Sequence, residues 1–248
     1  MIDKKTFISI FEGTSVKAEG IYEAQIIAKK CMEELSRYLK SGLSRDEIHD
    51  YCAEYMTSLG SQGWWIHNDP ALVLFGPLTT YSARQPADEY FKGKVLSDNE
   101  IISVDVAPTV RGGWGDITRT FFLKEGKIVS VEETGNQEWI EGMKLERYMH
   151  ARMKEFMNEK TTFSELHKFS EDILKEYGYH NCDYHDNYGH TIENDQSERV
   201  TICKEEDRCI AAYGKPFTYE PHICKDGGKY GMKHEIMYVF YKGKVEEI

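Results

Sequence analysis

VDVAPTVRGGWGDITRTFF, residues 104–122, carries two carboxylates on either side of a glycine-rich turn. Asp105 ends a mostly apolar run that begins at residue 101, so we expect it near the end of a buried strand. Asp116 comes eleven residues later and opens the next predicted strand. A hairpin formed by this stretch brings both carboxylates to one face of a sheet.

A second pair of carboxylates has the same arrangement further along the chain. Glu220 and Glu235 lie in two strand-like segments joined by the glycine-rich CKDGGKYG, residues 224–231. With His190, the four carboxylates form an oxygen-rich set suited to hard or borderline divalent cations. Taken singly, each residue is more often a turn, surface or hydrogen-bonded residue. The prediction of a metal site therefore rests on the whole set.

Buried carboxylates at this density are hard to explain without cations, because each isolated buried charge costs several kcal/mol. Two carboxylate hairpins and one histidine would hold a pair of cations about 3.5–4 Å apart with a bridging water.

A weak internal repeat divides the chain. Residues 43–60 match residues 161–178 at an offset of 118, and each copy opens with a predicted helix-capping box. The first box pairs Ser44 with Glu47, and the second pairs Thr162 with Glu165. A longer amphipathic helix precedes each copy.

Strand-like runs follow each copy of the repeat. They are residues 71–76, 100–108 and 117–123 in the first half and residues 208–214, 216–223 and 233–241 in the second. We therefore predict one domain over residues 1–248, made of two α+β halves at about 15–125 and 130–245 that are related by a pseudo-twofold axis.

Composition limits the classes of function. The 248 residues are 40% hydrophobic and 29% charged, and the net charge is −11. No lysine- or arginine-rich stripe is present to neutralise phosphates, so we expect no nucleic-acid partner. No run approaches the length of a membrane span and no secretory signal is evident, so we expect a cytoplasmic protein without membrane contact. Six cysteines without CxxC spacing indicate reduced thiols.

The motifs resemble the pita-bread metallopeptidase family M24, which includes methionine aminopeptidases, Xaa-Pro aminopeptidases, prolidases and creatinase. The D-x-x-P/A…G-x-x-x-D-I-T-R-T-F signature matches residues 105–121, and the family's Gly-His-x-Ile segment matches residues 189–192. Its Glu-Pro pair and last-strand Glu match Glu220-Pro221 and Glu235. The resemblance covers roughly residues 15–241 and implies a pita-bread α+β fold in a stand-alone catalytic domain.

The resemblance also implies a dinuclear metal centre. Asp116 and Glu235 would bridge the two ions. Asp105 would chelate one ion, and His190 with Glu220 would hold the other. The expected cofactors are two divalent ions drawn from Mn, Fe, Co or Zn.

The residues around the predicted metal ligands depart from the family pattern. Family peptidases usually carry two further histidines that contact substrate, and Tyr81 and Ser197 stand in or near their places here. The Arg usually found two residues before the last ligand is Lys233. Candidate substrate-binding residues are therefore Tyr81, His67, His222 and Ser197. His185 and His234 are further candidates, and Trp64 with Trp65 would form an aromatic wall or pack in the core.

Three functions are compatible with these residues. The first is a dinuclear hydrolase that cleaves an amide bond in a small peptide-like substrate with a metal-bridged hydroxide, Glu220 passing a proton to the leaving amine. The second is a non-peptidase M24-like lyase, hydrolase or iron-dependent oxidative enzyme acting on a small metabolite, because the usual histidines are absent. The third is a non-catalytic binding module. The expected partner is a small molecule or short peptide, and a homodimer is left open.

Overall fold

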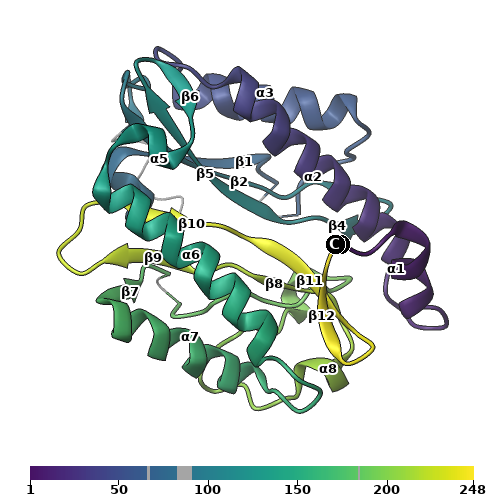
Figure 1. Ribbon diagram of the computed structural model, residues 1–248. Helices are drawn as coiled ribbons and strands as arrows, with labels where there is room; N and C mark the ends of the chain where they lie inside the picture. Colours follow the sequence, from purple (N-terminus) through teal and green to yellow (C-terminus); the bar gives the residue numbers. More distant parts are fainter. Residues whose placement is uncertain (66–67, 83–90, 184) are drawn as a thin grey trace.

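The computed structural model describes residues 1–65, 68–82, 91–183 and 185–248. Helices α2 (Ala18–Tyr38) and α3 (Arg45–Ser58) lie on one side of antiparallel strands, and α6 (Gln137–Phe156) and α7 (Phe163–Tyr177) lie on the other (Figure 1). This layering confirms the predicted α+β class. No helix in these ranges is both long enough and apolar enough to span a membrane.

A four-stranded antiparallel sheet lies under α2 and α3, in the order β1-β2-β5-β6. Its strands are β1 (Ala71–Phe75), β2 (Glu100–Val106), β5 (Ile117–Lys124) and β6 (Lys127–Val129). The remaining elements of this part are α1 (Lys4–Ile10), η1 (Gly76–Thr80), β3 (Thr109–Val110) and β4 (Gly113–Trp114).

Two three-stranded sheets lie on the side of α6 and α7, in the orders β10-β9-β7 and β12-β11-β8. Their strands are β7 (Tyr179–Asn181), β8 (Phe217–Tyr219), β9 (His222–Lys225), β10 (Gly231–Lys233), β11 (Ile236–Tyr241) and β12 (Lys244–Glu247). The remaining elements are α5 (Val131–Thr134), η2 (Gln196–Glu198) and α8 (Ile210–Tyr213).

One predicted strand is wrong. Within residues 208–214, Ile210–Tyr213 form the single-turn helix α8 instead of a strand. Gly214 ends this turn in the left-handed conformation, with a φ of 69°, and its N–H bonds to the carbonyl of Ile210. Residues 216–223 also divide into β8 and β9 at Glu220-Pro221, because proline has no N–H to contribute to a strand ladder.

Both predicted capping boxes are present. Ser44 accepts from the Glu47 amide at the start of α3, and Thr162 accepts from the Glu165 amide at the start of α7. In each box the glutamate side chain accepts from the cap residue's own N–H. These reciprocal bonds satisfy amides that the first helical turn leaves without partners.

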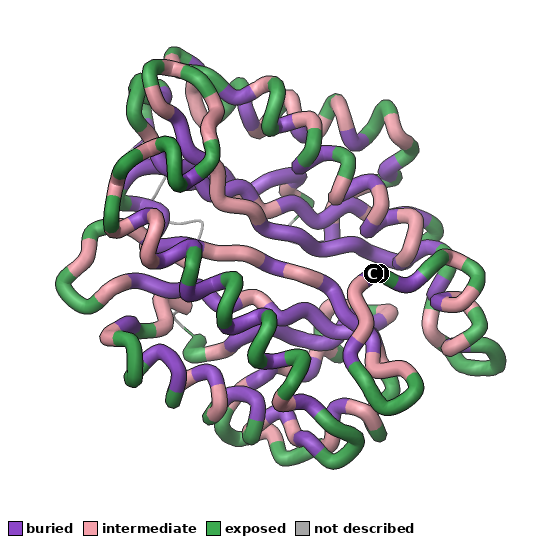
Figure 2. The backbone as a smooth tube through the Cα atoms, in the orientation of Figure 1, coloured by how far each residue is buried: buried purple, intermediate pink, exposed green. Residues whose placement is uncertain are grey.

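Strand β2 is buried on both faces, and the strands between the helical layers are mostly buried (Figure 2). Ile102 and Val104 belong to the core beneath α2 and α3, whereas Ile101 belongs to the core of α6 and α7. Because side chains alternate along a strand, Asp105 shares the Ile101 side. That side faces the part of the molecule that carries the second pair of predicted carboxylates.

Candidate metal centre

The first hairpin places two predicted ligands on one face. Asp105 of β2 lies opposite Thr118 of β5 in the antiparallel register. Asp116 comes two residues before Thr118, so strand alternation gives it the same side. The Thr118 hydroxyl donates to Glu235 Oε2 at 2.9 Å, which joins this face to the second half of the chain.

Asp116 is fixed through its main chain by a side chain of α2. The buried Gln25 donates from Nε2 to the Asp116 carbonyl at 3.1 Å and accepts from the Asp116 amide at Oε1 at 2.9 Å. Gly115 allows this close approach, because a Cβ there would lie 2.7 Å from the carbonyl carbon of Ala24. The helix and the turn therefore hold the carboxylate from behind.

The second hairpin repeats the arrangement with different residues. β9 pairs antiparallel with β10, and His222 lies opposite Lys233. Glu220 comes two residues before His222, and Glu235 comes two residues after Lys233. Both carboxylates thus occupy positions just beyond the paired ends of the hairpin.

A buried histidine of α6 holds the main chain beside Glu235. His150 Nε2 donates to the His234 carbonyl at 2.7 Å, so His150 Nδ1 accepts from the Tyr238 hydroxyl at 2.9 Å. Burial lowers the pKa of His150 to about 3, which keeps the ring neutral. His150 therefore positions the second hairpin through the backbone, as Gln25 positions the first.

His190 reaches the carboxylates from an extended segment packed on β8. Its amide donates to the Thr218 hydroxyl at 3.2 Å, and its carbonyl accepts from the Thr218 amide at 2.8 Å. Gly189 permits this approach, with a φ of 136° and a hypothetical Cβ only 2.2 Å from the Thr218 carbonyl oxygen. His190 Nδ1 donates to the Thr191 carbonyl at 3.1 Å, so Nε2 carries the free lone pair.

The five predicted residues meet at one centre. Ligand atoms of Asp116, His190 and Glu235 all lie within 4.8 Å of one another, and all three residues are buried. His190 Nε2 lies 3.4 Å from Asp116 Oδ2 and 3.5 Å from Glu220 Oε1. Asp105 joins the group through Lys233, whose Nζ contacts both Asp105 and Glu220.

Three observations fit divalent cations at this centre. Glu235 Oε1 is buried and has no hydrogen-bond partner among the described residues. The proton-free Nε2 of His190 lies 3.4 Å from Asp116 Oδ2, so its lone pair faces a carboxylate oxygen. Burial, reinforced by neighbouring carboxylates, raises the pKa values of Asp116 and Glu235 well above their usual range, which bound cations would relieve.

Lys233 supplies positive charge at the edge of the centre. Its Nζ lies 2.6 Å from Glu220 Oε2 and 3.2 Å from Asp105 Oδ2. Burial acts to raise the pKa of Glu220, but Lys233 and then His190 outweigh it, so this pKa lies below its usual value. Burial acts to lower the pKa of Lys233, yet Glu220 and Asp105 raise it well above its usual value. The pair is therefore ionised.

Aromatic rings and one arginine cover the histidine side of the centre. The Trp65 and Trp114 rings pack at a 30° tilt with centroids 4.0 Å apart, and they lie 5.6 and 5.8 Å from the His190 ring. The Arg199 guanidinium lies over Trp65 at 4.9 Å. Trp65 thus contributes to both predicted roles, the aromatic wall and the buried packing, whereas Trp64 packs partly buried against the first core.

The predicted substrate residues are scattered. His222 is buried and donates from Nε2 to the Thr79 carbonyl at 2.6 Å, so that ring nitrogen is already used. Ser197 lies in η2, where its hydroxyl donates to Asp195 at 2.7 Å. Tyr81 is exposed just after η1. His67 lies outside the described residues.

Sequence reasoning missed the polar residues that hold the predicted ligands. They are Gln25, His150, Thr118 and Thr218. The signal for the first two was present, because each falls on the buried stripe of a long amphipathic helix. The signal for the threonines was only their place two residues from a predicted ligand.

A search of curated protein sequences finds no match. The sequence profile of Metallopeptidase family M24 matches residues 19–242, and the chain therefore belongs to this family. This family is a class of metal-dependent hydrolases, which is the class that the sequence motifs predicted.

Solved structures share the fold at low sequence identity. The X-Pro aminopeptidase from Thermotoga maritima matches with a TM-score of 0.77 and 21% identity, over 99% of this chain and 64% of that one. Prolidase from Pyrococcus furiosus gives 0.74 and 19%, over 99% and 67%. Methionine aminopeptidase from Thermotoga maritima gives 0.71 and 14%, over 100% and 98%. The predicted pita-bread fold is thereby confirmed, and this chain spans 64% of the length of the first of these proteins.

Proposed function

We propose that this protein is a dinuclear metal-dependent hydrolase that cleaves an amide bond in a small peptide-like substrate. The observation that carries the proposal is the convergence of Asp116, His190 and Glu235 within 4.8 Å, with an unprotonated His190 Nε2. The proposed ligands are Asp105, Asp116, His190, Glu220 and Glu235.

The donor types support Mn, Fe, Co or Zn ions, because carboxylates and one imidazole suit hard and borderline divalent cations. Two such ions, when bound, supply a nucleophilic water at neutral pH and polarise the scissile carbonyl. His190 orients its Nε2 through the Nδ1 bond to the Thr191 carbonyl, as metal-binding histidines usually do.

Glu220 is the proposed acid–base residue. The charge of Lys233 keeps it ionised, so it can take a proton from the attacking water and pass it to the leaving amine. The Thr218 hydroxyl donates to Glu220 Oε1 at 3.1 Å and Lys233 holds Oε2, which together fix the orientation of the carboxylate.

The test is hydrolysis by protein that has been stripped of metal and then loaded with Mn, Fe, Co or Zn. We expect two ions per chain and cleavage of a dipeptide or of an N-terminal-Met peptide in a library. Asp116→Asn should abolish turnover and reduce bound metal, and Asp195→Asn, at the exposed N-cap of η2, is the matched control. Full metal loading without cleavage of any peptide would refute the peptidase assignment.

A second candidate is a non-peptidase metalloenzyme acting on a small metabolite by lysis, hydrolysis or iron-dependent oxidation. It is favoured by the side chains beside His190, which are Trp65, Trp114 and Arg199 and include no further histidine among the described residues. A metabolite screen with the Mn- and Fe-loaded protein separates the two, since turnover of a substrate without an amide bond would displace the peptidase.

We also propose that residues 1–248 act as one domain whose halves, about 15–125 and 130–245, arose by duplication. The shared strand β2 supports a single domain, because its two faces pack in different cores. One cooperative unfolding transition is expected in calorimetry. Sedimentation measurements would decide whether the chain forms a homodimer, and fractionation of cells would test the expected cytoplasmic location.

A further inference from the structure

A sulfur-rich cluster lies on the β7–β9 strand pair, and β9 begins two residues after Glu220. β7 pairs antiparallel with β9, and His180 lies directly opposite Cys224. Cys182 follows His180 by two residues and continues the ladder, because its amide donates to the His222 carbonyl at 2.6 Å. Strand alternation therefore puts His180, Cys182 and Cys224 on one face.

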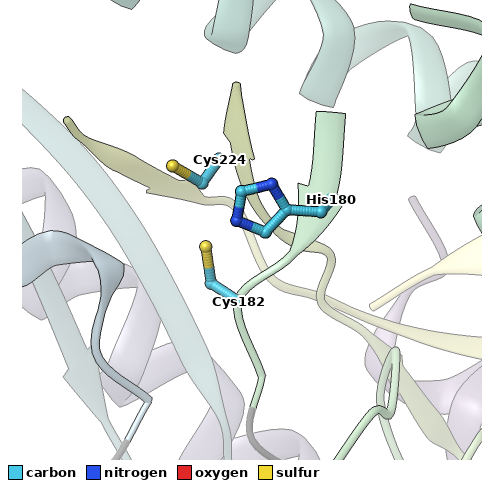
Figure 3. A group of neighbouring side chains, drawn as sticks. All are labelled: His180, Cys182 and Cys224. Atoms are coloured by element: carbon cyan, nitrogen blue, oxygen red, sulfur yellow. The ribbon is translucent and has the colours of Figure 1, made fainter. Parts of the chain in front are cut away.

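The three side chains converge. Figure 3 shows the two sulfur atoms on the same side of the imidazole ring, with Cys182 pointing towards it. One ligand atom from each residue lies within 4.8 Å of the other two. A tetrahedral zinc ion with bonds of about 2.0–2.3 Å would set these atoms about 3.3–3.8 Å apart, so binding requires only a small inward movement.

The imidazole is already oriented for a metal. His180 Nδ1 donates to Asp226 Oδ1 at 2.9 Å, which leaves Nε2 with its lone pair free. The Asp226 amide donates to the Gly178 carbonyl at 2.9 Å, so the carboxylate is itself anchored. A carboxylate on the far nitrogen is the usual outer partner of a metal-binding histidine, because it fixes the tautomer and raises the basicity of the ligand.

One of the two thiols, Cys224, is prepared to lose its proton, whereas the hydrogen bond to Cys224 and then burial raise the pKa of Cys182. Hydrogen bonding from Cys182, and then the nearby His180, lowers the pKa of Cys224 to about 7 against the opposing effect of burial. The thiolate is the form that binds metal. The His180 side chain is 55% exposed, so an ion can enter from solvent.

We propose that His180, Cys182 and Cys224 bind one thiophilic divalent ion, with Zn²⁺ the best match. Two sulfurs and one imidazole nitrogen are typical zinc donors, and three protein ligands leave a fourth position for water. This donor set differs from the oxygen-rich acidic centre, so each site selects its own ion. A bound ion would tie β7 to β9 and stiffen the hairpin that carries Glu220 and Glu235.

The test is a cobalt titration of the reduced, metal-free full-length protein. Thiolate-to-cobalt charge transfer gives a near-ultraviolet band that carboxylate and histidine ligands cannot produce. We expect one equivalent of cobalt to produce this band and excess Zn²⁺ to abolish it.

Variants locate the site. Cys182→Ser and Cys224→Ser should remove the band, His180→Ala should shift it and weaken binding, and Asp226→Asn should weaken binding about 10–100-fold. Cys203→Ser is the matched control and should leave the band unchanged. Because His180 is largely exposed, its replacement tests the site even if a buried Cys224→Ser variant fails to fold.

Asp116→Asn separates this proposal from the proposed function. It should reduce total bound metal yet keep the thiolate band. Absence of the band in reduced wild-type protein would overturn the sulfur site and leave the acidic centre untouched. Persistence of the band in both cysteine variants would also overturn the sulfur site. So would a Cys182–Cys224 disulfide that forms in air while the reduced protein binds no cobalt.

Discussion

The two carboxylate hairpins are held from behind by different chemical groups. On the first, Gln25 of α2 bonds both main-chain groups of Asp116. On the second, His150 of α6 bonds the carbonyl of His234, next to Glu235. Both side chains fix a hairpin by bonding to its main chain, but the amide of Gln25 does not titrate and the imidazole of His150 does. The molecule therefore has one hairpin whose support is independent of pH and one whose support fails in acid.

The largest effect is expected where the two hairpins meet, at Lys233. Lys233→Met removes the cation between Asp105 and Glu220, and breaking a buried ion pair costs about 3–5 kcal/mol. We expect the free energy of unfolding, measured in urea on the metal-free protein at pH 7, to fall by about 3 kcal/mol. This is the low end of the range because the Lys233 side chain is 17% exposed and its charge is partly solvated.

This loss should shrink when the carboxylates are neutralised. Divalent metal or a lower pH removes the uncompensated negative charge that the variant leaves behind, whereas Lys233→Arg keeps a cation and serves as the control. Equal stability of wild type and Lys233→Met without metal at pH 7 would show that the ion pair contributes nothing.

The amide support is tested by Gln25→Met. This change keeps side-chain volume but leaves the Asp116 N–H and C=O without their partner, at about 1–3 kcal/mol for a buried group left unpaired. We expect this destabilisation in urea unfolding to be the same at pH 7.5 and pH 5, and metal affinity to fall as well. Lys30→Met, at an exposed position of the same helix, should change stability by less than about 0.5 kcal/mol.

The imidazole support is tested by pH. The folded protein holds the pKa of His150 at about 3, below the ordinary value of about 6.5 in the unfolded chain. The unfolded state therefore binds a proton first, so this contribution to stability is complete above about pH 6.5 and is lost as pH falls towards 3. The loss is about 1.4 kcal/mol per pH unit, or about 2 kcal/mol at pH 5.

His150→Gln should flatten this acid limb, because glutamine can still donate to the His234 carbonyl without titrating. The measurement is the unfolding free energy of metal-free protein at pH 7.5 and pH 5. His180→Gln, at a largely exposed histidine, should keep the wild-type slope. A slope unchanged in His150→Gln would mean that other groups carry the acid sensitivity.

The smallest expected difference lies between the two helix caps. Ser44→Ala and Thr162→Ala each remove one capping box, and each should cost about 1 kcal/mol in thermal or urea unfolding. Similar costs would extend the likeness of the two halves to their energetics. A cap whose loss is neutral would mark the half that tolerates a frayed helix.

The sequence predicted the features that depend on local pattern. Both capping boxes, the long helices and the two carboxylate hairpins follow from spacing and turn residues close together in the chain. It failed at α8, where a short apolar run ending in Gly214 suits either one helical turn or a strand. Short runs of this kind do not settle the choice by periodicity.

The supports of the hairpins were not predictable for a different reason. Gln25 bonds a residue 91 positions away, and His150 bonds one 84 positions away. Both bonds go to main-chain atoms, which have no residue-specific signature. The pattern of a helix reveals that such a polar side chain is buried, but the tertiary fold alone decides which backbone it meets.

Because β2 packs against a core on each face, an error in its register with β5 disturbs both faces of the strand at once. If β2 slipped by one residue against β5, Val104 or Val106 would replace Asp105 on the side of the acidic centre. The Asp105 carboxylate would then point into the hydrophobic core beneath α2. Such a chain would lose a ligand and a well-packed interior together. Ions captured by the correctly aligned form would stabilise it alone, and so bias folding towards that alignment.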